Sequence, residues 1–140
     1  MDLSSYFTAA KGGDTAFSVE APKIKFGAGV LTETGSDAKA LGMQRVAVFT
    51  DSRIRELEPV HKVILALKQA GIDLAIFDET EVEPTDRSFK AATAFAAEGK
   101  FDGFVSVGGG SVMDTVKAAN LYSTFPDEFL AYVNAPIGKA

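Results

Sequence analysis

The sequence predicts an α/β domain built on an open parallel sheet, and three observations lead to this prediction. Short apolar runs typical of strands alternate with longer segments whose apolar residues recur at helical spacing. The connections between successive runs are long enough for right-handed crossovers. A run of three glycines, Gly108–Gly110, follows one expected strand and precedes an expected helix. The chain has 140 residues, of which 46% are hydrophobic, which is enough to form the core of one such domain.

The chain divides into a short arm and one domain. Residues 1–17 are polar and are expected to form a flexible N-terminal arm. The remaining residues, 18–140, form the expected α/β domain. Its first segment, residues 18–26, alternates weakly in hydropathy and contains Pro22, which predicts an edge strand or an irregular hairpin.

Helices and strands then alternate along the domain. A helix is expected from the glycines near residue 28 to about Leu41, and Gly42 is placed as its C-terminal stop. After it come three runs apolar enough for buried strands, and three segments with one apolar helical face. The strands are expected at 46–50, 72–77 and 104–107, and the helices from Pro59 to Gly71, from an N-cap at Asp86 to Gly99, and from Ser111 to about Tyr122.

The glycine turn before the last helix predicts a site for a phosphate or pyrophosphate. In such a turn, free backbone N–H groups and the positive end of the helix dipole point at a bound anion. Because Gly108, Gly109 and Gly110 carry no side chain, a phosphate can approach the main chain, and positive φ angles are permitted. The segment has neither the Walker A pattern nor the Gly-x-Gly-x-x-Gly fingerprint. The pattern therefore indicates a phosphate without indicating which nucleotide carries it.

A structural interpretation of the same turn stands beside this one. Tight turns between a strand and a helix often use glycine, and Ser111 can be an N-cap that forms a capping box with Asp114. Three consecutive glycines are more than a tight turn needs, which favours the phosphate site.

The position of this turn also predicts the strand order. The glycines follow the third expected strand, whereas the first expected strand ends at Thr50-Asp51-Ser52. Ligands of open α/β sheets bind beyond the carboxyl ends of the strands, at a topological switch point. If both strand ends serve one ligand, the first and third strands are neighbours and the order is second, first, third.

Asp51 is a second candidate for a contact with a nucleotide. A carboxylate after the first strand can accept hydrogen bonds from ribose hydroxyls and would repel a 2′-phosphate, which favours NAD over NADP. Arg53 and Arg55 are close enough in sequence to weaken that exclusion. An aspartate after a strand is also a common turn former, so both interpretations stay open.

Composition and the other polar residues exclude several classes of site. The net charge of −5, without clustered Lys or Arg, argues against a nucleic-acid or acidic-membrane partner, and no apolar run approaches membrane-spanning length. No cysteine is present to form disulfides or thiolate metal sites. His61, the only histidine, has no partners for a metal site, and the acidic run 78–83 is expected to be a solvated loop. No nucleophile–base pair follows from the spacing, so no catalytic and no metal-ligating residue is assigned.

Beyond these patterns, Gly108–Lys117 resembles the glycine-rich pyrophosphate motif of the iron-containing (group III) alcohol dehydrogenase family. The resemblance covers roughly residues 18–139 and is closest to the hydroxyacid-oxoacid transhydrogenase branch. The segments that carry it are Lys25–Gly29, Thr50-Asp51, Val82–Asp86, Asp102-Gly103, Lys117–Tyr122 and Tyr132–Lys139.

The resemblance implies a fold, a cofactor and site residues. The fold is a Rossmann-like dinucleotide-binding domain similar to the N-terminal domain of dehydroquinate synthase. The implied cofactor is NAD: Gly109, Gly110 and Ser111 contact its pyrophosphate, Asp51 contacts the adenosine ribose, and Asp114 lies near the nicotinamide side. Many alcohol-oxidising members carry Asn where this sequence has Glu83, and this departure argues for the transhydrogenase branch.

The resemblance also implies parts that this chain lacks. In the family a helical domain holds a divalent metal, iron or zinc, through one Asp and three His, whereas this chain stops at Ala140 and has one histidine. We therefore expect an apparently truncated NAD-binding domain, inactive alone, from an enzyme that acts on a small-molecule hydroxyacid or alcohol. The branch implies 4-hydroxybutyrate as donor and 2-oxoglutarate as acceptor. An apolar face exposed by truncation would favour a homo-oligomer.

Two further expectations concern location and the alternative function. Residues 1–17 show no apolar signal core and no Arg-rich transit pattern, so a cytoplasmic location is expected, or a mitochondrial one for a eukaryotic transhydrogenase. The alternative function is a stand-alone nucleotide- or phosphate-binding α/β module without catalysis. In a third interpretation the domain is structural and the glycines only form a turn.

Overall fold

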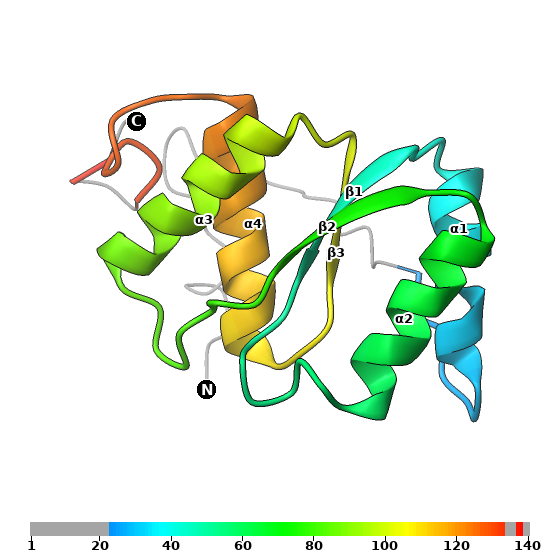
Figure 1. The fold of residues 1–140 in the computed structure, drawn as a ribbon. Helices are drawn as coiled ribbons and strands as arrows, with labels where there is room; N and C mark the ends of the chain where they lie inside the picture. The colour runs from blue at the N-terminus through cyan, green and yellow to red at the C-terminus, as the bar shows by residue number, and fades with distance from the viewer. Residues whose placement is uncertain (1–22, 134–136, 139–140) are drawn as a thin grey trace, which may run out of the picture.

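The computed structural model describes residues 23–133 and 137–138 and has alternating strands and helices (Figure 1). A 3-10 helix at Val30–Glu33 leads directly into the first α-helix. The elements that follow are α1 (Thr34–Ala40), β1 (Arg45–Phe49), α2 (Glu58–Gln69), β2 (Asp73–Phe77), α3 (Asp86–Gly99), β3 (Gly103–Ser106) and α4 (Gly110–Thr124). The predicted alternation of strands and helices is therefore confirmed.

The three strands form one parallel sheet in the order β2-β1-β3. The central strand pairs with both neighbours: Val48 lies opposite Ile76 on one side and Val105 on the other. The order predicted from the position of the glycine turn is confirmed. The carboxyl ends of β1 and β3 consequently lie side by side, where the sequence predicts a shared ligand.

Helices cover both faces of the sheet, because the side chains of β1 point alternately to one face and the other. Val46 and Val48 pack in a cluster with residues of α1 and α2, whereas Ala47 and Phe49 pack with residues of α3 and α4. Figure 1 shows the two helix pairs on opposite sides of the sheet. All four of these side chains are fully buried, and burial of each large one contributes about 1.5–3 kcal/mol.

Phe49 is the centre of an aromatic cluster on the α3–α4 face. Its ring centroid lies 5.1 Å from that of Phe77, 5.8 Å from that of Phe95 and 6.3 Å from that of Phe104. These separations fall in the range of favourable tilted and edge-to-face aromatic pairs. The cluster joins all three strands to α3, so it fixes the sheet against this helix layer.

The connection from β2 to α3 crosses the carboxyl end of β1. It does so because β2 and β3 lie on opposite sides of β1, and the chain passes from the β2 side to the face that α3 covers. An isolated antiparallel bridge between Asp51 and Glu79 marks the crossing point. We call residues 78–85 the crossover loop.

Several element boundaries differ from the sequence prediction. The N-cap of α3 is Thr85, not Asp86: the Thr85 hydroxyl accepts from the Ser88 amide, and the Ser88 hydroxyl accepts from the Thr85 amide. This pair is a reciprocal capping box. Residues 23–26 form no strand, and the expected arm and the rest of the expected edge strand lie outside the described residues.

The glycine at the end of α3 has a different role from the C-terminal stop that the sequence predicts. Gly99 is its last helical residue, and the left-handed position belongs to Lys100, with φ of 49°. A Cβ at Gly99 would lie 2.0 Å from the ring of Phe101, so glycine is required there for space. By contrast Gly42 (φ 80°) and Gly71 (φ 76°) adopt the left-handed conformation expected of C-terminal stops.

The strand β3 is less buried than its apolar sequence predicts. Phe104 and Val105 are partly exposed and Ser106 is exposed, because β3 is an edge strand of the described sheet. Exposed apolar side chains also occur along α4 and after it, among them Met113, Leu121 and Phe125. None of the helices in the described part of the chain combines the length and apolar character that a membrane span requires.

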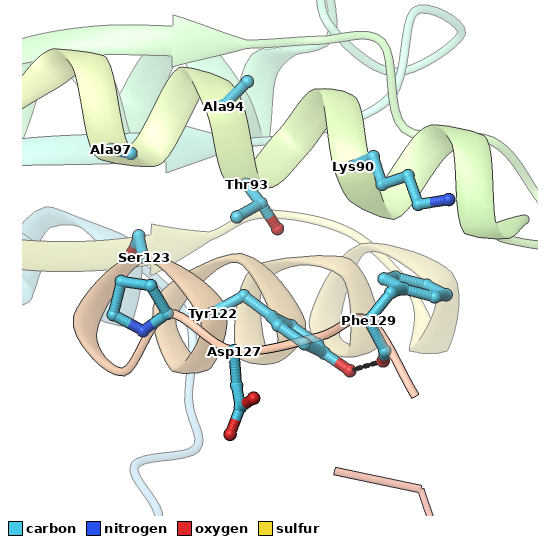
Figure 2. Close-up of a pocket in the computed structure, with 9 residues that line it drawn as sticks. Lys90, Thr93, Ala94, Ala97, Tyr122, Ser123, Asp127 and Phe129 are labelled. Carbon is cyan, nitrogen blue, oxygen red and sulfur yellow. Dashed lines mark hydrogen bonds between the residues drawn. The ribbon is translucent and has the colours of Figure 1, made fainter. Parts of the chain in front are cut away.

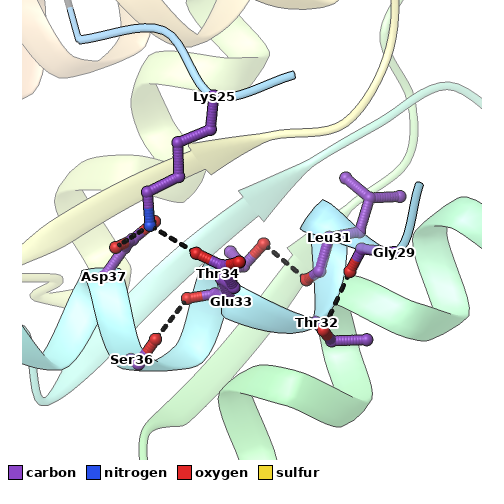
Figure 3. A network of polar contacts seen from close by, with 8 residues as sticks. All are labelled: Lys25, Gly29, Leu31, Thr32, Glu33, Thr34, Ser36 and Asp37. Atoms are coloured by element: carbon purple, nitrogen blue, oxygen red, sulfur yellow. Dashed lines mark hydrogen bonds and ion pairs between the residues drawn. The ribbon is translucent and has the colours of Figure 1, made fainter. Parts of the chain in front are cut away.

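Lys25 anchors the segment that precedes the 3-10 helix (Figure 3). Its ammonium donates to the Asp37 carboxylate at 2.6 Å and to the Glu33 carboxylate at 2.7 Å. The hydrogen bond to Asp37, and then the one to Glu33, raise the pKa of Lys25 above its ordinary value. The group is exposed, so salt screens this attraction strongly.

A second polar cluster closes the amino end of the sheet. The Asp102 carboxylate accepts from the Gln44 amide at 3.0 Å and from the Arg45 amide at 2.9 Å. The Arg45 side chain donates to the Gly99 carbonyl at 2.9 Å and pairs with the Asp73 carboxylate. Asp102 thus ties the start of β3 to the start of β1.

This clamp generates a prediction about stability. We expect Asp102→Ala to lower the free energy of unfolding by about 1–2 kcal/mol, because two backbone donors lose a charged acceptor. Asp102→Asn keeps one acceptor oxygen and should lose less. Asp73→Ala, which removes an exposed ion pair, should cost at most about 0.5 kcal/mol. Urea unfolding of the three variants checks the order, and equal losses for Asp102→Ala and Asp73→Ala would contradict it.

Candidate functional site

A small cavity lies beyond the carboxyl end of β1, in the crevice that β1 shares with β3. Its volume is about 80 Å³, which suits one small group and not a whole dinucleotide. Three segments supply its walls: the exit from β1, the crossover loop and the start of α4. The lining residues are Asp51, Arg53, Thr80, Glu81, Val82, Gly109, Gly110, Ser111 and Val112. The structure therefore brings Asp51 and the glycine turn together, as the sequence predicts.

The start of α4 supplies free backbone donors to this cavity. Gly109 is the N-cap, and its carbonyl accepts from the amides of Val112 and Met113, both at 3.1 Å. The amides of Gly110 and Ser111, the first two helical residues, find no acceptor within residues 23–133 and 137–138. Free first-turn amides and the positive end of the helix dipole favour an anion at this point.

The glycine turn works differently from the prediction. None of Gly108, Gly109 and Gly110 has a positive φ, and Gly109 has extended backbone with φ of −86°. Glycine is needed at position 108 for space, because a Cβ there would lie 2.5 Å from Cγ2 of the buried Val112. A Cβ at Gly109 or Gly110 would meet no atom within 4 Å, so their bare backbone leaves room for a ligand.

Ser111 is not the N-cap that the structural interpretation of the turn proposes. It is the second residue of α4, and neither it nor Asp114 forms a capping box, since the cap is Gly109 without a side-chain bond. The Ser111 hydroxyl instead donates to the Val82 carbonyl in the crossover loop. Two walls of the cavity are thereby joined, and the Ser111 amide is left for a ligand.

Asp51 forms a turn and also lines the cavity. Its Oδ1 accepts from the amides of Arg53 at 3.0 Å and Ile54 at 3.3 Å, which confirms the turn-forming role. The same side chain lines the cavity and is only 13% exposed. One carboxylate oxygen is therefore held by the turn, which fixes the orientation of the group toward the cavity.

The two nearby arginines lie in different environments. Arg53 lines the cavity and is 67% exposed, and its Nε lies 3.4 Å from Asp51 Oδ1. Arg55 is turned away toward Asp78 and Glu56, at 3.6 Å from each carboxylate. Of these two arginines, Arg53 is therefore the one whose positive charge lies close to a ligand bound beside Asp51.

Sequence reasoning missed the part of the site that comes from the crossover loop. The acidic run 78–83 is expected to be solvated, but Thr80 is buried and Glu81 is partly buried, and both line the cavity. Glu81 accepts from the Thr85 hydroxyl and from Arg87, both at 3.1 Å. The signal that could have located these residues is the predicted strand order, because it requires this loop to cross the end of β1.

Comparison with known proteins identifies the family of this chain. The family model for iron-containing alcohol dehydrogenases matches residues 21–139. The chain belongs to this family. Its relatives include proteins named mitochondrial hydroxyacid-oxoacid transhydrogenase: that of Bos taurus is 48% identical over 94% of this chain, and that of Xenopus laevis 50% identical over 93%. The chain spans 28% of the length of each of these relatives.

Solved structures of iron-containing alcohol dehydrogenases have the same fold. A 1,3-propanediol oxidoreductase superposes with a TM-score of 0.73 at 30% identity, over 77% of this chain and 28% of its own. The NADH-dependent butanol dehydrogenase A of Thermotoga maritima gives a TM-score of 0.76 at 25% identity, over 89% and 32%. The α/β fold with a parallel sheet, inferred from the sequence, is therefore confirmed as that of this oxidoreductase family.

Asp114, which the resemblance to this family places near nicotinamide, lies outside the cavity. Its side chain is exposed on α4, one turn after the residues that line the cavity, with a carboxylate oxygen 3.9 Å from Lys117 Nζ. The structure thus leaves it free to contact a part of a ligand that extends beyond the cavity.

The metal of the iron-containing family has no binding site among the described residues. No group of three or more His, Cys, Asp or Glu side chains there could hold a metal ion. His61 is exposed on α2, with Nε2 3.3 Å from a Glu56 carboxylate oxygen. These residues do not fit the family's metal, and we assign no metal-dependent step to them.

A larger groove of about 440 Å³ lies elsewhere, between α3 and the segment after α4 (Figure 2). The Tyr122 hydroxyl donates to the Phe129 carbonyl, and Lys90 lies over the Phe129 ring, 4.8 Å from its centroid. The groove contains none of the site residues expected from the sequence and no helix N-terminus. We therefore take the smaller cavity as the candidate site.

Substitution by alanine should affect stability differently at Gly108, which has no space for a side chain, and at Gly109, which has. Gly108→Ala should lower the free energy of unfolding by about 1–3 kcal/mol, because its methyl group overlaps Val112. Gly109→Ala should change it by less than about 0.5 kcal/mol, since the methyl group enters open space. Thermal and urea unfolding measure both, and equal destabilisation would show that the turn geometry described above is wrong.

Proposed function

We propose that this chain binds NAD as the dinucleotide-binding part of a metal-dependent hydroxyacid oxidoreductase, with the pyrophosphate at the start of α4. The observation that carries the proposal is the convergence of two free amides, at Gly110 and Ser111, with Asp51 in one cavity beyond the central strand. Such crevices at the carboxyl ends of strands are where dinucleotides bind in open α/β sheets. The family to which the chain belongs supports the same cofactor.

Each residue then has a role set by its position. Gly109, Gly110 and Ser111 offer main-chain donors and open space to the pyrophosphate, and Gly108 allows the turn to pack against Val112. Asp51 accepts from a hydroxyl of the adenosine ribose. In this proposal Asp114 faces the nicotinamide half from the next turn of α4. When bound, NAD accepts or donates a hydride; the residues of this chain bind and orient it, and none is proposed as catalytic.

We further propose a preference for NAD over NADP. Asp51 and Glu81 both line the cavity with carboxylates, and a 2′-phosphate beside them would be repelled. Arg53 lies beside Asp51 and reduces this repulsion without removing it, because its exposed guanidinium is screened by solvent.

The substrate and the whole protein form a separate part of the proposal. The names of the relatives support a hydroxyacid as hydride donor and an oxoacid as acceptor; we propose 4-hydroxybutyrate and 2-oxoglutarate as this pair. Residues 18–140 would then be the NAD-binding domain, after an N-terminal arm at 1–17. We propose self-association through exposed apolar side chains such as Met113 and Phe125. The names of the relatives also support a mitochondrial location for a eukaryotic protein.

Calorimetric titration of the chain tests the binding proposal. NAD and ADP-ribose should both bind saturably, and NADP should bind about tenfold more weakly, which corresponds to about 1.4 kcal/mol of repulsion. Gly109→Val should abolish binding of all three while leaving the fold intact, because the side chain enters open space in the free protein. A folded Gly109→Val variant that binds NAD like the unchanged chain would exclude this site.

Asp51→Asn tests the role of the carboxylate more cleanly than Asp51→Ala. The amide oxygen of Asn can still accept from the Arg53 and Ile54 amides, so the turn is preserved while the charge is removed. We expect the affinity for NAD to fall by about three- to tenfold and the discrimination against NADP to decrease, with the part that Glu81 contributes remaining. A stand-alone phosphate-binding module would not lose affinity for its ligand, because Asp51 would make no favourable contact with it.

A further inference from the structure

Two buried threonine hydroxyls have no hydrogen-bond partner among the described residues. They are those of Thr50 and Thr80, whose side chains lie at the carboxyl end of the sheet. A buried hydroxyl without a partner loses its hydration and gains nothing in return, so such groups are rare and indicate a specific cause. The bridge between Asp51 and Glu79 places both threonines next to the candidate site.

Only one of the two hydroxyls belongs to the cavity. Thr80, which is 7% exposed, is part of the cavity wall together with Gly110 and Ser111, whereas Thr50 is not. The cavity wall thus contains two main-chain amides that are unused in the free chain, and a threonine whose buried hydroxyl is also unused. The unpartnered hydroxyl of Thr80 is a second observation, independent of the free amides at the helix terminus. Both observations favour a ligand that accepts hydrogen bonds, such as a phosphate.

The crossover loop holds Thr80 in a fixed place. The loop is attached on one side of Thr80 by the bridge from Glu79 to Asp51, and on the other side by the bond from Ser111 to the Val82 carbonyl. Threonine can occupy more than one χ1 rotamer, so its hydroxyl can turn toward a ligand without movement of the backbone.

The charge around the cavity makes a neutral donor useful. Both carboxylates in the wall have partners of their own: Asp51 holds the turn amides, and Glu81 accepts from Thr85 and Arg87. They still disfavour an anion through space, and Arg53 is too exposed to compensate fully. An additional neutral hydrogen-bond donor in the cavity would therefore increase the affinity for a phosphate group.

We propose that Thr80 is a positioning residue for the pyrophosphate of the cofactor, and that its hydroxyl donates to a phosphate oxygen bound at the start of α4. This inference rests on the proposed function, since it concerns the same cavity. It adds a side chain from the crossover loop to a site that otherwise binds phosphate through main-chain amides. The phosphate group is then held from two sides, by α4 and by the loop.

Three substitutions test the proposal on the full chain. Thr80→Val keeps the shape of the side chain and removes the hydroxyl, and it should lower the affinity for ADP-ribose about tenfold without lowering the melting temperature. Thr80→Ser keeps the hydroxyl and should restore binding to within about twofold. Thr50→Val, the matched control, removes the other unpartnered hydroxyl and should leave ADP-ribose affinity unchanged.

The outcomes separate this inference from the proposed function. If the unchanged chain does not bind ADP-ribose, the proposed function fails and the role of Thr80 fails with it. If the unchanged chain binds and Thr80→Val binds equally well, only the role of Thr80 is overturned. If Thr80→Val and Thr50→Val lose affinity and melting temperature together, the hydroxyls support the fold and the positioning role is again overturned.

Discussion

The burial of β1 on both faces is the constraint on which the rest of the structure depends. Its residues Val46–Phe49 are fully buried, and within the described sheet it is the strand with neighbours on both sides. A strand of this kind leaves no exposed face for polar side chains. Polar residues therefore gather at its two ends, where Asp102 closes the amino end and Thr50-Asp51 opens the carboxyl end.

The candidate site follows from the topology around this strand. Because β2 and β3 lie on opposite sides of β1, the chain passes over one end of β1 on its way from β2 to α3. That passage brings Thr80 to face the start of α4, although Thr80 and Ser111 are far apart in sequence. The glycine turn alone would offer amides on one side; the crossing loop makes the second wall of a cavity.

The sequence predicted the features that depend on local pattern and on the place of a motif. Strand order and the meeting of Asp51 with the glycine turn followed from the rule that ligands bind where strand ends converge. Capping was predicted less well, because Thr85 and Asp86 are adjacent and both can cap a helix, and only backbone geometry decides between them. The burial of Thr80 could not be predicted from its neighbours in an acidic run, since it depends on contacts with segments distant in the chain. The reason for glycine at position 108 could not be predicted from local sequence either. Glycine is needed there because a side chain would overlap Val112, and not because the backbone has a positive φ.

The hydrogen bond from Ser111 to the Val82 carbonyl has a consequence for how a ligand enters the site. A loop that is free in solution loses conformational entropy when a ligand orders it, and that loss reduces affinity. Here the crossover loop is already fastened to α4 in the ligand-free chain. Part of the conformational entropy of the loop has therefore been lost on folding, and binding requires less further ordering of the loop. Association should therefore depend less on a closing step of the loop than it would if the loop were free.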